Sequence, residues 1–597
     1  MLNKNNTRVN LMKTFFSLSL LFIPSIIYPQ SLPIFMDGRT DDWNIPVPTY
    51  IDSENDGNIN DFKYFSVTND EQFLFIKIKI TPFLKLTEDN QLSIFIDGDN
   101  NSSTGYQVNG IGAELRFNFG TRNGFNYHTN TSITHSSIQF RSLPTVTDTT
   151  YEIAIGRQFI PPANGTGTIR IFFTDNSSNG DWMPNSGETF DYNFDETPTE
   201  PVVPIELSRE DTSLLRVMNW NVLNDGLLDP GREQIFTRIL QVINPDVIGF
   251  NEMWNSSVSQ VQNKLNNILP LQTGNWNAIK LDGGNITASK YPVLQSWLVY
   301  PGQRITASLI DLPERFVKDL LIINCHYKCC GGSTNDATRQ RETDATIAFI
   351  LDAKTPGGVI DLPNQTPIMI LGDLNLVGDR QQLITLLTGE IINTQLFGNG
   401  GPPDWDDTNL EDLLSSQSDK RTAYTWRDDQ NTFSPGRLDY HIFSNSVINV
   451  EKDFVLQTEV MSQSRLNQYG LQLLDTRNAS DHFPKVSDIS FGFTTDIKNE
   501  HGELNFILEQ NYPNPFNPAT NIRFHLPAGK AGIQDRGFVS LRIYDLLGRE
   551  VATLVNEEKS AGEYEVKFDG KDKTSGVYFI VLKAGNYIAT KKMIYLK

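Results

Sequence analysis

Six short polar motifs in the middle of the chain carry residue types that metal and proton chemistry requires. They occupy residues 219–222 (NWNV), 249–252 (GFNE), 324–328 (NCHYK), 372–375 (GDLN), 437–440 (RLDY) and 480–482 (SDH). Their carboxylate and amide oxygens are hard ligands, which suit Mg²⁺, Mn²⁺ or Ca²⁺ better than Zn²⁺. Their two histidines, His326 and His482, titrate near neutral pH and can transfer protons. Such a set can neutralise a phosphate ester, activate a water molecule and protonate a leaving oxygen.

The motifs follow apolar stretches that have the length and composition of buried strands. These stretches alternate with helical patterns: the strands are expected at 214–217, 247–250, 320–324 and 369–371, and the helices at 233–243, 258–268 and 337–351. The alternation predicts an α/β domain. A single acid at a strand end is usually a turn residue or a helix cap, whereas six polar motifs placed in this way are better explained by one shared cleft.

The order of the GDLN, RLDY and SDH motifs resembles the endonuclease/exonuclease/phosphatase superfamily, which includes deoxyribonuclease, apurinic endonuclease and bacterial sphingomyelinase. The resemblance covers residues 213–492. It implies a four-layer α/β/β/α sandwich and a metal-dependent phosphoesterase activity. It also implies that Mg²⁺, or else Mn²⁺ or Ca²⁺, is bound through Asn221, Glu252 and Asp481.

The same resemblance implies roles for the residues that handle water and protons. His326 matches a histidine proposed to protonate the leaving group, and Asp373 and Asn375 match a pair that positions the water, or a second metal, and the phosphate. Asp439 resembles the aspartate that orients the last histidine, and His482 resembles the base or the stabiliser of the transition state. A neighbouring carboxylate favours the charged imidazolium of each histidine. Whether Asp373 or His482 accepts the proton of the water stays open.

Two departures from the motifs of apurinic endonucleases narrow the choice of branch within the superfamily. Apurinic endonucleases carry an acid where this chain has Leu223 and a tyrosine where it has His326, which favours the deoxyribonuclease/sphingomyelinase branch. Sphingomyelinases press an aromatic hairpin into the bilayer. Residues 397–409 offer only Phe397 and Trp405, and therefore no convincing membrane-insertion device.

For other residues of the central domain, the sequence gives weaker evidence of substrate binding. Lys290 could face the phosphate, although an ordinary solvated lysine is as good an interpretation. Arg339 could contact the substrate, but a solvated helix face is the favoured interpretation, and Trp426 is expected in the core. The three cysteines, all within residues 325–330, predict packed thiols or one local disulfide rather than a zinc site.

Residues 31–194 predict an antiparallel β-sandwich, because short alternating runs such as 73–78, 92–96 and 169–173 are separated by Asn/Asp/Gly turns. The layout resembles carbohydrate-binding-module family 9 and related DOMON-like sandwiches, which implies a glycan ligand. Aromatic platforms for a sugar would be Trp43, Tyr106 and Trp182, which could equally be core residues.

Calcium is considered at two loops of this sandwich. Asp97, Asp99 and Asn101 could hold a structural Ca²⁺, or they form an Asx-rich hairpin loop. The run Asp52 to Gly57 begins like an EF-hand loop, but Lys63 stands at its twelfth position, so it fails that pattern.

Residues 506–597 carry the motifs NYPNPFNP at 511–518, YDLLGREV at 544–551 and SGVYF at 575–579. They resemble the type A sorting domain of the type IX secretion system and predict a small β-sandwich. The resemblance implies the type IX secretion machinery as a partner and release or attachment outside the outer membrane. Linkers are expected at 195–212, which holds three prolines, and at 493–505.

The two ends of the chain agree on export. Residues 1–30 predict a signal peptide, since Lys4, Arg8 and Lys13 precede an apolar stretch at 15–28. A membrane anchor is the weaker alternative because the stretch is short and interrupted, and we expect no transmembrane segment in the mature chain. The length of 597 residues predicts three or four domains.

The formal charge of −21 argues against a standing electrostatic attraction to nucleic acid. It does not exclude a nucleic-acid substrate, because a bound divalent cation supplies positive charge locally. The sequence therefore favours a secreted metal-dependent phosphodiesterase, foremost an extracellular nuclease. A phosphatase or a sphingomyelinase-like phospholipid phosphodiesterase is the alternative within enzymes. A surface glycan-binding protein with an inert catalytic-like domain is the alternative of another class, and the complete polar set speaks against it.

Overall fold

The computed structural model of the chain describes residues 33–43, 46–53, 56–162, 165–209, 211–492, 507–509, 511–526, 537–545, 549–584 and 587–597. The predicted signal peptide lies outside these residues. The chain divides into two compact units, Met1–Phe493 and Thr494–Lys597, and each is described by itself. Among the described residues, no helix has both the length and the apolar character needed to cross a membrane.

The first unit begins with the predicted antiparallel β-sandwich. One sheet has the order β1-β2-β3-β11-β10 and the other the order β13-β12-β4-β7-β8-β9, with β14 beside β12. The first sheet comprises β1 (Thr49–Ile51), β2 (Asp61–Asn69), β3 (Phe73–Leu84), β10 (Arg141–Leu143) and β11 (Asp148–Gly156). The second comprises β4 (Leu92–Asp97), β7 (Leu115–Asn118), β8 (Asn123–Asn126), β9 (Thr131–Thr134), β12 (Thr168–Asp175), β13 (Trp182–Met183) and β14 (Asp191–Asn193). A separate hairpin pairs β5 (Tyr106–Val108) with β6 (Ile111–Ala113).

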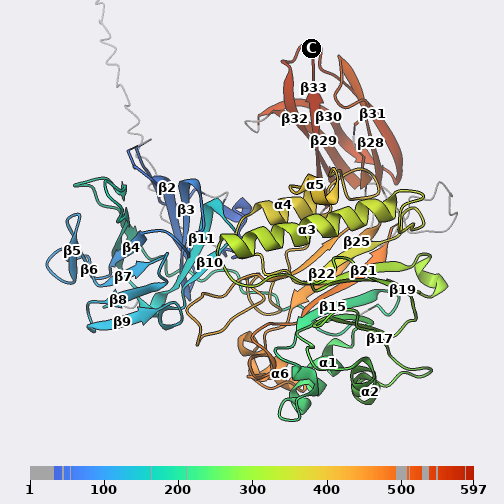
Figure 1. The fold of residues 1–597 in the computed structure, drawn as a ribbon. Coiled ribbons are helices and arrows are strands. Elements are labelled where there is room, and N and C mark those ends of the chain that lie inside the picture. The colour runs from blue at the N-terminus through green and yellow to red at the C-terminus, as the bar shows by residue number, and fades with distance from the viewer. Residues whose placement is uncertain are drawn as a thin grey trace, which may run out of the picture. The chain divides into compact units, whose positions relative to one another are not determined.

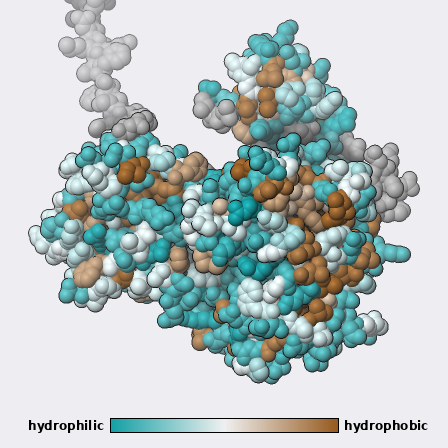
Figure 2. Space-filling view, in the orientation of Figure 1, coloured by the Kyte–Doolittle hydropathy of each residue, from teal (hydrophilic) through white to brown (hydrophobic). Residues whose placement is uncertain are grey.

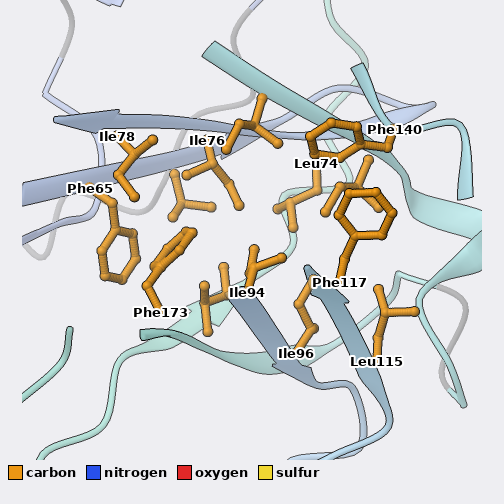
Figure 3. Packing of buried hydrophobic residues seen from close by; sticks show 14 of the residues in the cluster. Phe65, Leu74, Ile76, Ile78, Ile94, Ile96, Leu115, Phe117, Phe140 and Phe173 are labelled. Atoms are coloured by element: carbon orange, nitrogen blue, oxygen red, sulfur yellow. The ribbon is translucent and has the colours of Figure 1, made fainter. Parts of the chain in front are cut away.

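The core of this sandwich follows from alternation along its strands. Leu74, Ile76 and Ile78 of β3 project from one sheet toward Ile94 and Ile96 of β4 on the other (Figure 3). Successive side chains of a strand point to opposite faces, so these alternate residues face the same core, whereas β4 is buried on both of its faces. The strands predicted at 73–78, 92–96 and 169–173 are confirmed.

The rest of the first unit is an α/β domain built on two six-stranded sheets. The first sheet has the order β17 (Asn277–Ile279), β18 (Ile286–Ser289), β16 (Val247–Asn251), β15 (Leu215–Asn221), β26 (Lys485–Phe491) and β25 (Ile448–Val455). The second has the order β19 (Val293–Leu298), β20 (Ile305–Ile310), β21 (Leu320–His326), β22 (Ile368–Asp373), β24 (Asp439–Phe443) and β23 (Glu411–Asp412). Apolar residues of both sheets, including Val217, Val247, Ile322 and Leu371, pack in one buried cluster between them.

Helices cover the outer face of each sheet (Figure 1). Helices α1 (Glu233–Ile243) and α2 (Val258–Ile268) cover the first sheet, and α3 (Ser333–Lys354) and α4 (Gln381–Thr388) cover the second. The result is the four-layer α/β/β/α arrangement that the sequence predicted. Three short helices, α5 (Thr394–Phe397), α6 (Gln463–Tyr469) and α7 (Asp475–Ala479), lie in the connections.

Local sequence explains the helices well. In α1, Phe236, Ile239, Leu240 and Ile243 recur every three or four residues and are buried. Helix α2 begins at a capping box, in which the Ser257 side chain and the Gln260 side chain each bond to the other residue's backbone N–H. The predicted bounds of α1 and α2 are confirmed, whereas α3 extends beyond 337–351 at both ends.

The expected linker 195–212 packs against the α/β domain over part of its length. The Leu207 side chain is fully buried in the cluster that includes α1. The Ile205 N–H donates to the carbonyl of Ser418 at 2.8 Å. This segment therefore belongs to the first unit rather than spanning open solvent. On the face shown in Figure 2, hydrophobic residues gather on the right-hand side of the first unit and form smaller groups elsewhere among hydrophilic ones.

The second unit is a small antiparallel sandwich, as predicted. One sheet has the order β27 (Ile507–Leu508), β28 (Ala519–Leu526) and β31 (Gly562–Asp569). The other has the order β30 (Glu550–Lys559), β29 (Gly537–Asp545), β32 (Gly576–Ala584) and β33 (Tyr587–Tyr595). Its core includes Ile522, Phe524, Leu541, Ile580 and Met593.

Candidate active site

Strand register brings the polar motifs together at one edge of the two sheets. In the second sheet, His326 at the end of β21 lies opposite Asp373 of β22, and Asp373 lies opposite Asp439 of β24. In the first sheet, Asn221 at the end of β15 lies opposite Asn251 of β16. Because the packed sheets end at the same edge, side chains from both can meet there.

Asn221 connects the two sheets at this edge. Its Nδ2 donates to Glu252 Oε1 at 3.1 Å and to Asp373 Oδ2 at 3.0 Å. Glu252 also accepts from the backbone N–H of Asn224 at 3.0 Å. One amide therefore holds two carboxylates close together, although each lies at the end of a different sheet.

The backbone at these positions adopts uncommon conformations. Glu252 has φ 61° and Asn375 has φ 47°, in the left-handed region that non-glycine residues rarely occupy. Gly372 has φ 124°, and a Cβ there would lie 2.1 Å from the carbonyl oxygen of Cys325. The glycine of GDLN is therefore required for the close approach of β22 to β21.

His482 is oriented by a buried carboxylate. Its Nδ1 lies 2.8 Å from Asp439 Oδ2, and Asn219 Nδ2 donates to Asp439 Oδ1 at 3.0 Å. Burial by itself would lower the pKa of His482, but Asp439 and Asp373 outweigh it and raise the pKa to about 10. Burial also raises the pKa of Asp373 to about 7, against the opposing effect of His482. The other nitrogen of His482, Nε2, lies 3.6 Å from Asp373 Oδ2.

His326 has a different environment. Its Nε2 also lies 3.6 Å from Asp373 Oδ2, and its ring lies 5.5 Å from that of Trp254. Burial, and then the charges of Arg304 and His482, hold its pKa well below the usual value. The expectation of a charged imidazolium therefore agrees with His482 but not with His326, since burial outweighs the single carboxylate near His326.

The motif residues surround one cavity of about 260 Å³. Six residues predicted for the site line it: Glu252, His326, Asp373, Asn375, Asp481 and His482. Asn221 and Asp439 lie behind this lining and position it through the hydrogen bonds above.

The two predicted substrate-binding residues are not brought to this cavity. Lys290 lies beyond β18, where its Nζ contacts Asp246 Oδ1 at 3.1 Å, at the start rather than the end of the β16 strand. Arg339 is fully buried, so the expectation of a solvated helix face is wrong for this residue. Its Nη1 donates to the carbonyls of Lys328 and Cys330 at 2.7 and 2.8 Å. It therefore positions the loop that follows His326.

Several functional neighbours were missed or misplaced by sequence reasoning. Trp426 was expected in the core, but it lines the cavity and its Nε1 donates to Asp481 Oδ2 at 2.8 Å. Asn251 lies beneath the site, where its Nδ2 donates to Oδ1 of Asn285 and of Asn324, each at 2.9 Å. Asn251 and Asn324 lie inside the predicted motifs, so the sequence could have indicated their part in the site, whereas no motif surrounds Asn285. The three cysteines are free thiols.

The N-terminal sandwich holds two groups of acids. Asp97, Asp99 and Glu114 offer oxygens within 4.8 Å of one another, and so do Asp52, Asp56 and Asp181. The side-chain oxygen of Asn101 instead accepts from the backbone N–H of Ser103 at 3.1 Å, and Glu114 takes its place in the first group. The second group joins Asp52 and Asp56, from the loop that fails the EF-hand pattern, to Asp181, which comes from a distant part of the chain.

The donor set of the cavity fits a divalent metal. The carboxylates of Glu252, Asp373 and Asp481 and the amide of Asn375 bring hard oxygen donors to the lining, which also includes the thiols of Cys329 and Cys330. The side-chain oxygen of Asn221 accepts from the Leu223 N–H at 3.1 Å, while its Nδ2 faces the carboxylates. The hydrogen bonds from Asn221 keep two of these carboxylates adjacent despite their mutual repulsion. An Mg²⁺-like ion is the natural counter-charge for such an arrangement.

Comparison with known families gives two matches. The endonuclease/exonuclease/phosphatase family matches residues 218–482, and the secretion system C-terminal sorting domain matches residues 510–596. The N-terminal sandwich remains without an assigned family. A search of curated proteins found no match.

Solved structures that resemble the chain have low identity. An endonuclease/exonuclease/phosphatase from Beutenbergia cavernae DSM 12333 is 14% identical, with a TM-score of 0.30, covering 64% of this chain and 99% of that chain. The AP endonuclease LMAP from Leishmania major is 14% identical, with a TM-score of 0.28, covering 49% and 93%. ANGEL2, a 2',3'-cyclic phosphatase in complex with adenosine-2',3'-vanadate, is 12% identical, with a TM-score of 0.29, covering 47% and 97%.

For the central domain, the motifs, the fold and the matched range 218–482 all indicate the same family. The matched range 510–596 agrees with the export predicted from the sequence. Residues 218–482 therefore form an endonuclease/exonuclease/phosphatase family phosphoesterase domain, in a chain whose sorting domain directs it by type IX secretion to the cell surface or the extracellular space.

Proposed function

We propose that the chain is a divalent-metal-dependent phosphodiesterase that acts outside the cell, with nucleic acid as its substrate. The observation that carries the proposal is the joining of Glu252 and Asp373 by Asn221, beside the two histidines His326 and His482. This arrangement supplies in one place the metal donors and the proton-transfer groups that phosphodiester hydrolysis requires.

Glu252, Asn221 and Asp481 would hold the metal, which we propose to be Mg²⁺, with Mn²⁺ or Ca²⁺ as alternatives. When bound, the ion neutralises the phosphate oxygens and lowers the pKa of a coordinated water. Trp426 keeps the Asp481 carboxylate oriented through its indole N–H. Each carboxylate of this set would then bind the ion while it also accepts a hydrogen bond that orients it.

The remaining residues handle protons and the phosphate. Asp439 fixes the tautomer and orientation of His482, whose Nε2 then faces Asp373. Asp373 or His482 accepts the proton of the attacking water, and the partner that stays charged stabilises the developing charge. His326, on the other side of Asp373, would donate a proton to the leaving oxygen in the substrate complex, where the phosphate charge opposes the burial that lowers its pKa in the free chain, and Asn375 would position the phosphate.

The proposal is tested with the mature chain and four substrates: plasmid DNA, RNA, sphingomyelin and nucleotide monoesters, each with Mg²⁺ and with a chelator. Mg²⁺-dependent cleavage of DNA or RNA is the expected result. Hydrolysis of sphingomyelin or of the monoesters alone would instead favour the phospholipid phosphodiesterase or the phosphatase. Absence of metal-dependent hydrolysis on all four substrates would refute the enzyme proposal.

A glycan ligand for the N-terminal sandwich has support from one surface feature. Tyr106 and Trp182 are each 40% exposed, and they are connected through Phe95 and Phe172 in a continuous row of ring contacts. Trp43, by contrast, is buried and donates to Glu152 Oε1 at 2.8 Å, so it cannot serve as a sugar platform. We propose that Tyr106 and Trp182 are the glycan-binding aromatics, testable by polysaccharide pull-down with Trp182→Ala.

A structural Ca²⁺ in the sandwich is proposed at Asp97, Asp99 and Glu114. Glu114 is buried, and burial is the main cause that raises its pKa, as it is for Asp97. A cation would remove the cost of ionising these groups in the folded state. Isothermal titration with Ca²⁺ tests the proposal, and an absence of binding heat would reject it.

A further inference from the structure

Three acids from separate segments of the N-terminal sandwich lie together, outside the lining of the cavity that holds the polar motifs. Asp52 directly follows β1, Asp56 lies between β1 and β2, and Asp181 directly precedes β13. One side-chain oxygen of each acid lies within 4.8 Å of those of the other two. Oxygens bound to one Ca²⁺ at about 2.4 Å can be at most roughly 5 Å apart, so this spacing is compatible with a single ion of that size.

Two of the three carboxyl groups are buried without a compensating positive charge. Asp52 is 7% exposed and Asp181 is 4% exposed. Lys63 pairs with Asp61, and in the ranges that the structure describes no basic side chain forms an ion pair with any of the three acids. Removing an unpaired charge from water is costly, so these buried groups need either a cation or a proton.

The Asp52 carboxyl group has one oxygen that the protein leaves unpaired. Its Oδ1 accepts from Asn185 Nδ2 at 2.9 Å, whereas its Oδ2 is closed to solvent and accepts no hydrogen bond from the described residues. Burial first, and then the charge of Asp181, raise the pKa of Asp52, so its carboxyl group faces the other acids. Buried polar atoms in folded proteins nearly always have a partner, and the unpaired oxygen therefore points to a ligand between the acids.

The fold positions Asp181 without the help of an ion. Its Oδ2 accepts from the Phe62 N–H at 2.6 Å and its Oδ1 accepts from the Trp182 N–H at 2.7 Å. A carboxylate oxygen has more than one lone pair and can bind an ion while it accepts a hydrogen bond. Asn60 Nδ2 donates to Asp175 Oδ2 at 2.9 Å, which ties the segment before β2 to the end of β12. The carboxylate is therefore already oriented when an ion arrives.

A glycine allows the loop that carries Asp56 to approach Asp181. A Cβ at Gly57 would lie 2.0 Å from the carbonyl oxygen of Asn60 and 3.0 Å from the Cβ of Asp181. The loop lacks the last acid of an EF-hand, since Lys63 stands at that position, but Asp181 brings a carboxylate from a distant segment. Asp56 is exposed, so water can complete the roughly six to eight oxygen ligands that Ca²⁺ takes.

We propose that Asp52, Asp56 and Asp181 bind one Ca²⁺, and that this ion joins the loop between β1 and β2 to strand β13. The site is distinct from the Ca²⁺ site proposed for the other acidic group of the sandwich and from the metal site of the α/β domain. Trp182, proposed above to bind glycan, directly follows Asp181. The ion therefore also fixes the backbone from which this exposed side chain projects.

Calorimetric titration of the mature chain with Ca²⁺ tests the proposal, with excess Mg²⁺ present to fill the site of the α/β domain. Asp52→Asn should weaken one Ca²⁺ site at least tenfold, because the amide keeps an acceptor for Asn185 but replaces the unpaired oxygen by a nitrogen. Asp56→Asn, at an exposed position, should weaken the same site. The matched control is Asp89→Asn, which alters an exposed acid of the sandwich outside both acidic groups and should bind Ca²⁺ as the parent chain does.

Terbium luminescence tests where the ion binds. Tb³⁺ replaces Ca²⁺ and emits when it accepts energy from a nearby excited indole. We expect a component of this emission that Ca²⁺ displaces and that disappears in both Asp52→Asn and Trp182→Phe. Trp182→Phe should still bind Ca²⁺ with the affinity of the parent, since the indole is not a ligand. Asp99→Asn, in the other acidic group, should retain the component.

The same number and affinity of Ca²⁺ sites in the parent chain, Asp52→Asn and Asp56→Asn would overturn the proposal. Terbium emission that is fully retained in Asp52→Asn would overturn it as well, and so would equal affinity of this site for Mg²⁺ and Ca²⁺. The proposal is independent of the hydrolytic function, because the three acids lie outside the cavity of the polar motifs. Asp52→Asn should therefore hydrolyse phosphate esters at the rate of the parent chain.

Discussion

His482 Nδ1 lies 2.8 Å from Asp439 Oδ2, and this contact joins the last motif of the chain to the RLDY strand. It fixes the orientation of the imidazole, because the carboxylate accepts from Nδ1 and leaves Nε2 directed toward Asp373. The pair is buried, so its strength does not depend on surface screening.

Asp439→Asn should lower kcat at least about a hundredfold, because an amide no longer stabilises the imidazolium or fixes its tautomer. It should also lower the pKa of His482 from about 10, since Asp439 is the largest cause that raises it. Steady-state kinetics measure the first effect, and NMR titration of the metal-free chain measures the second. Asp406→Asn, at an exposed loop position, is the control, and an unchanged kcat in Asp439→Asn would contradict the assignment.

Glu252→Gln should abolish metal-dependent activity while preserving the fold, because the amide keeps the shape but removes the charge that attracts the cation. Calorimetric titration should show Mg²⁺ binding to the parent chain and weakened binding to the variant. The control Glu233→Gln alters an exposed acid of α1. Retention of both Mg²⁺ affinity and activity in Glu252→Gln would remove this residue from the metal site.

Chelation should abolish hydrolysis of every substrate, and excess Mg²⁺ should restore it, because no lysine or arginine of the α/β domain lines the cavity in its described part and the charged His482 cannot replace a divalent ion. Circular dichroism with and without chelator checks that the fold survives. Full activity in the presence of chelator would exclude the metal-dependent mechanism.

Gly372→Ala should destabilise the α/β domain strongly, by about 3 kcal/mol or more, because the new Cβ meets the Cys325 carbonyl at 2.1 Å and φ is 124°. The matched control is Gly274→Ala, where φ is 76° but no atom lies within 4 Å of the Cβ position. It should cost only about 1 kcal/mol. The free energy of unfolding of both variants, measured by denaturant titration, separates the cost of the steric clash from the cost of the positive φ. Equal losses of this free energy in the two variants would show that the structure relieves the clash.

The N-terminal sandwich should lose stability as the pH rises from about 4 to 7. Burial first, and then the neighbouring acids, raise the pKa of Asp52 to about 7, and burial with nearby acids raises that of Asp181 to about 6. An unfolded aspartate ionises near pH 4. A carboxyl whose pKa is higher in the folded state contributes stability that is present at low pH and is lost as the pH rises through that pKa.

Thermal unfolding in the presence of chelator should therefore show a lower melting temperature at pH 7.5 than at pH 5 for the transition of the sandwich. Double replacement by Asp52→Asn and Asp181→Asn should flatten this dependence. A melting temperature that stays constant or rises over this range in the parent chain would contradict the assigned shifts.

The sequence alone determined the class of chemistry and the layers of the fold. Local periodicity predicted α1 and α2 within their observed bounds, and Asn221, Glu252, His326 and Asp373 each end or follow a buried strand as expected. Asp439 instead begins β24, and the SDH motif lies between α7 and β26, so these residues were identified by their motifs and not by a preceding strand. The specialised C-terminal motifs likewise indicated the sorting domain that the family comparison matched.

Only the tertiary structure decided which residues share the cavity. Lys290 and Arg339 had suitable charges, but strand direction and helix packing place one at the opposite end of a strand and bury the other. Trp426 and Asn285 gave no local pattern, because their hydrogen bonds join segments far apart in the chain. Such contacts arise from strand register and from packing between distant segments, as where Val146 of the sandwich shares a buried cluster with Leu374 of the α/β domain, and short-range periodicity carries no information about either.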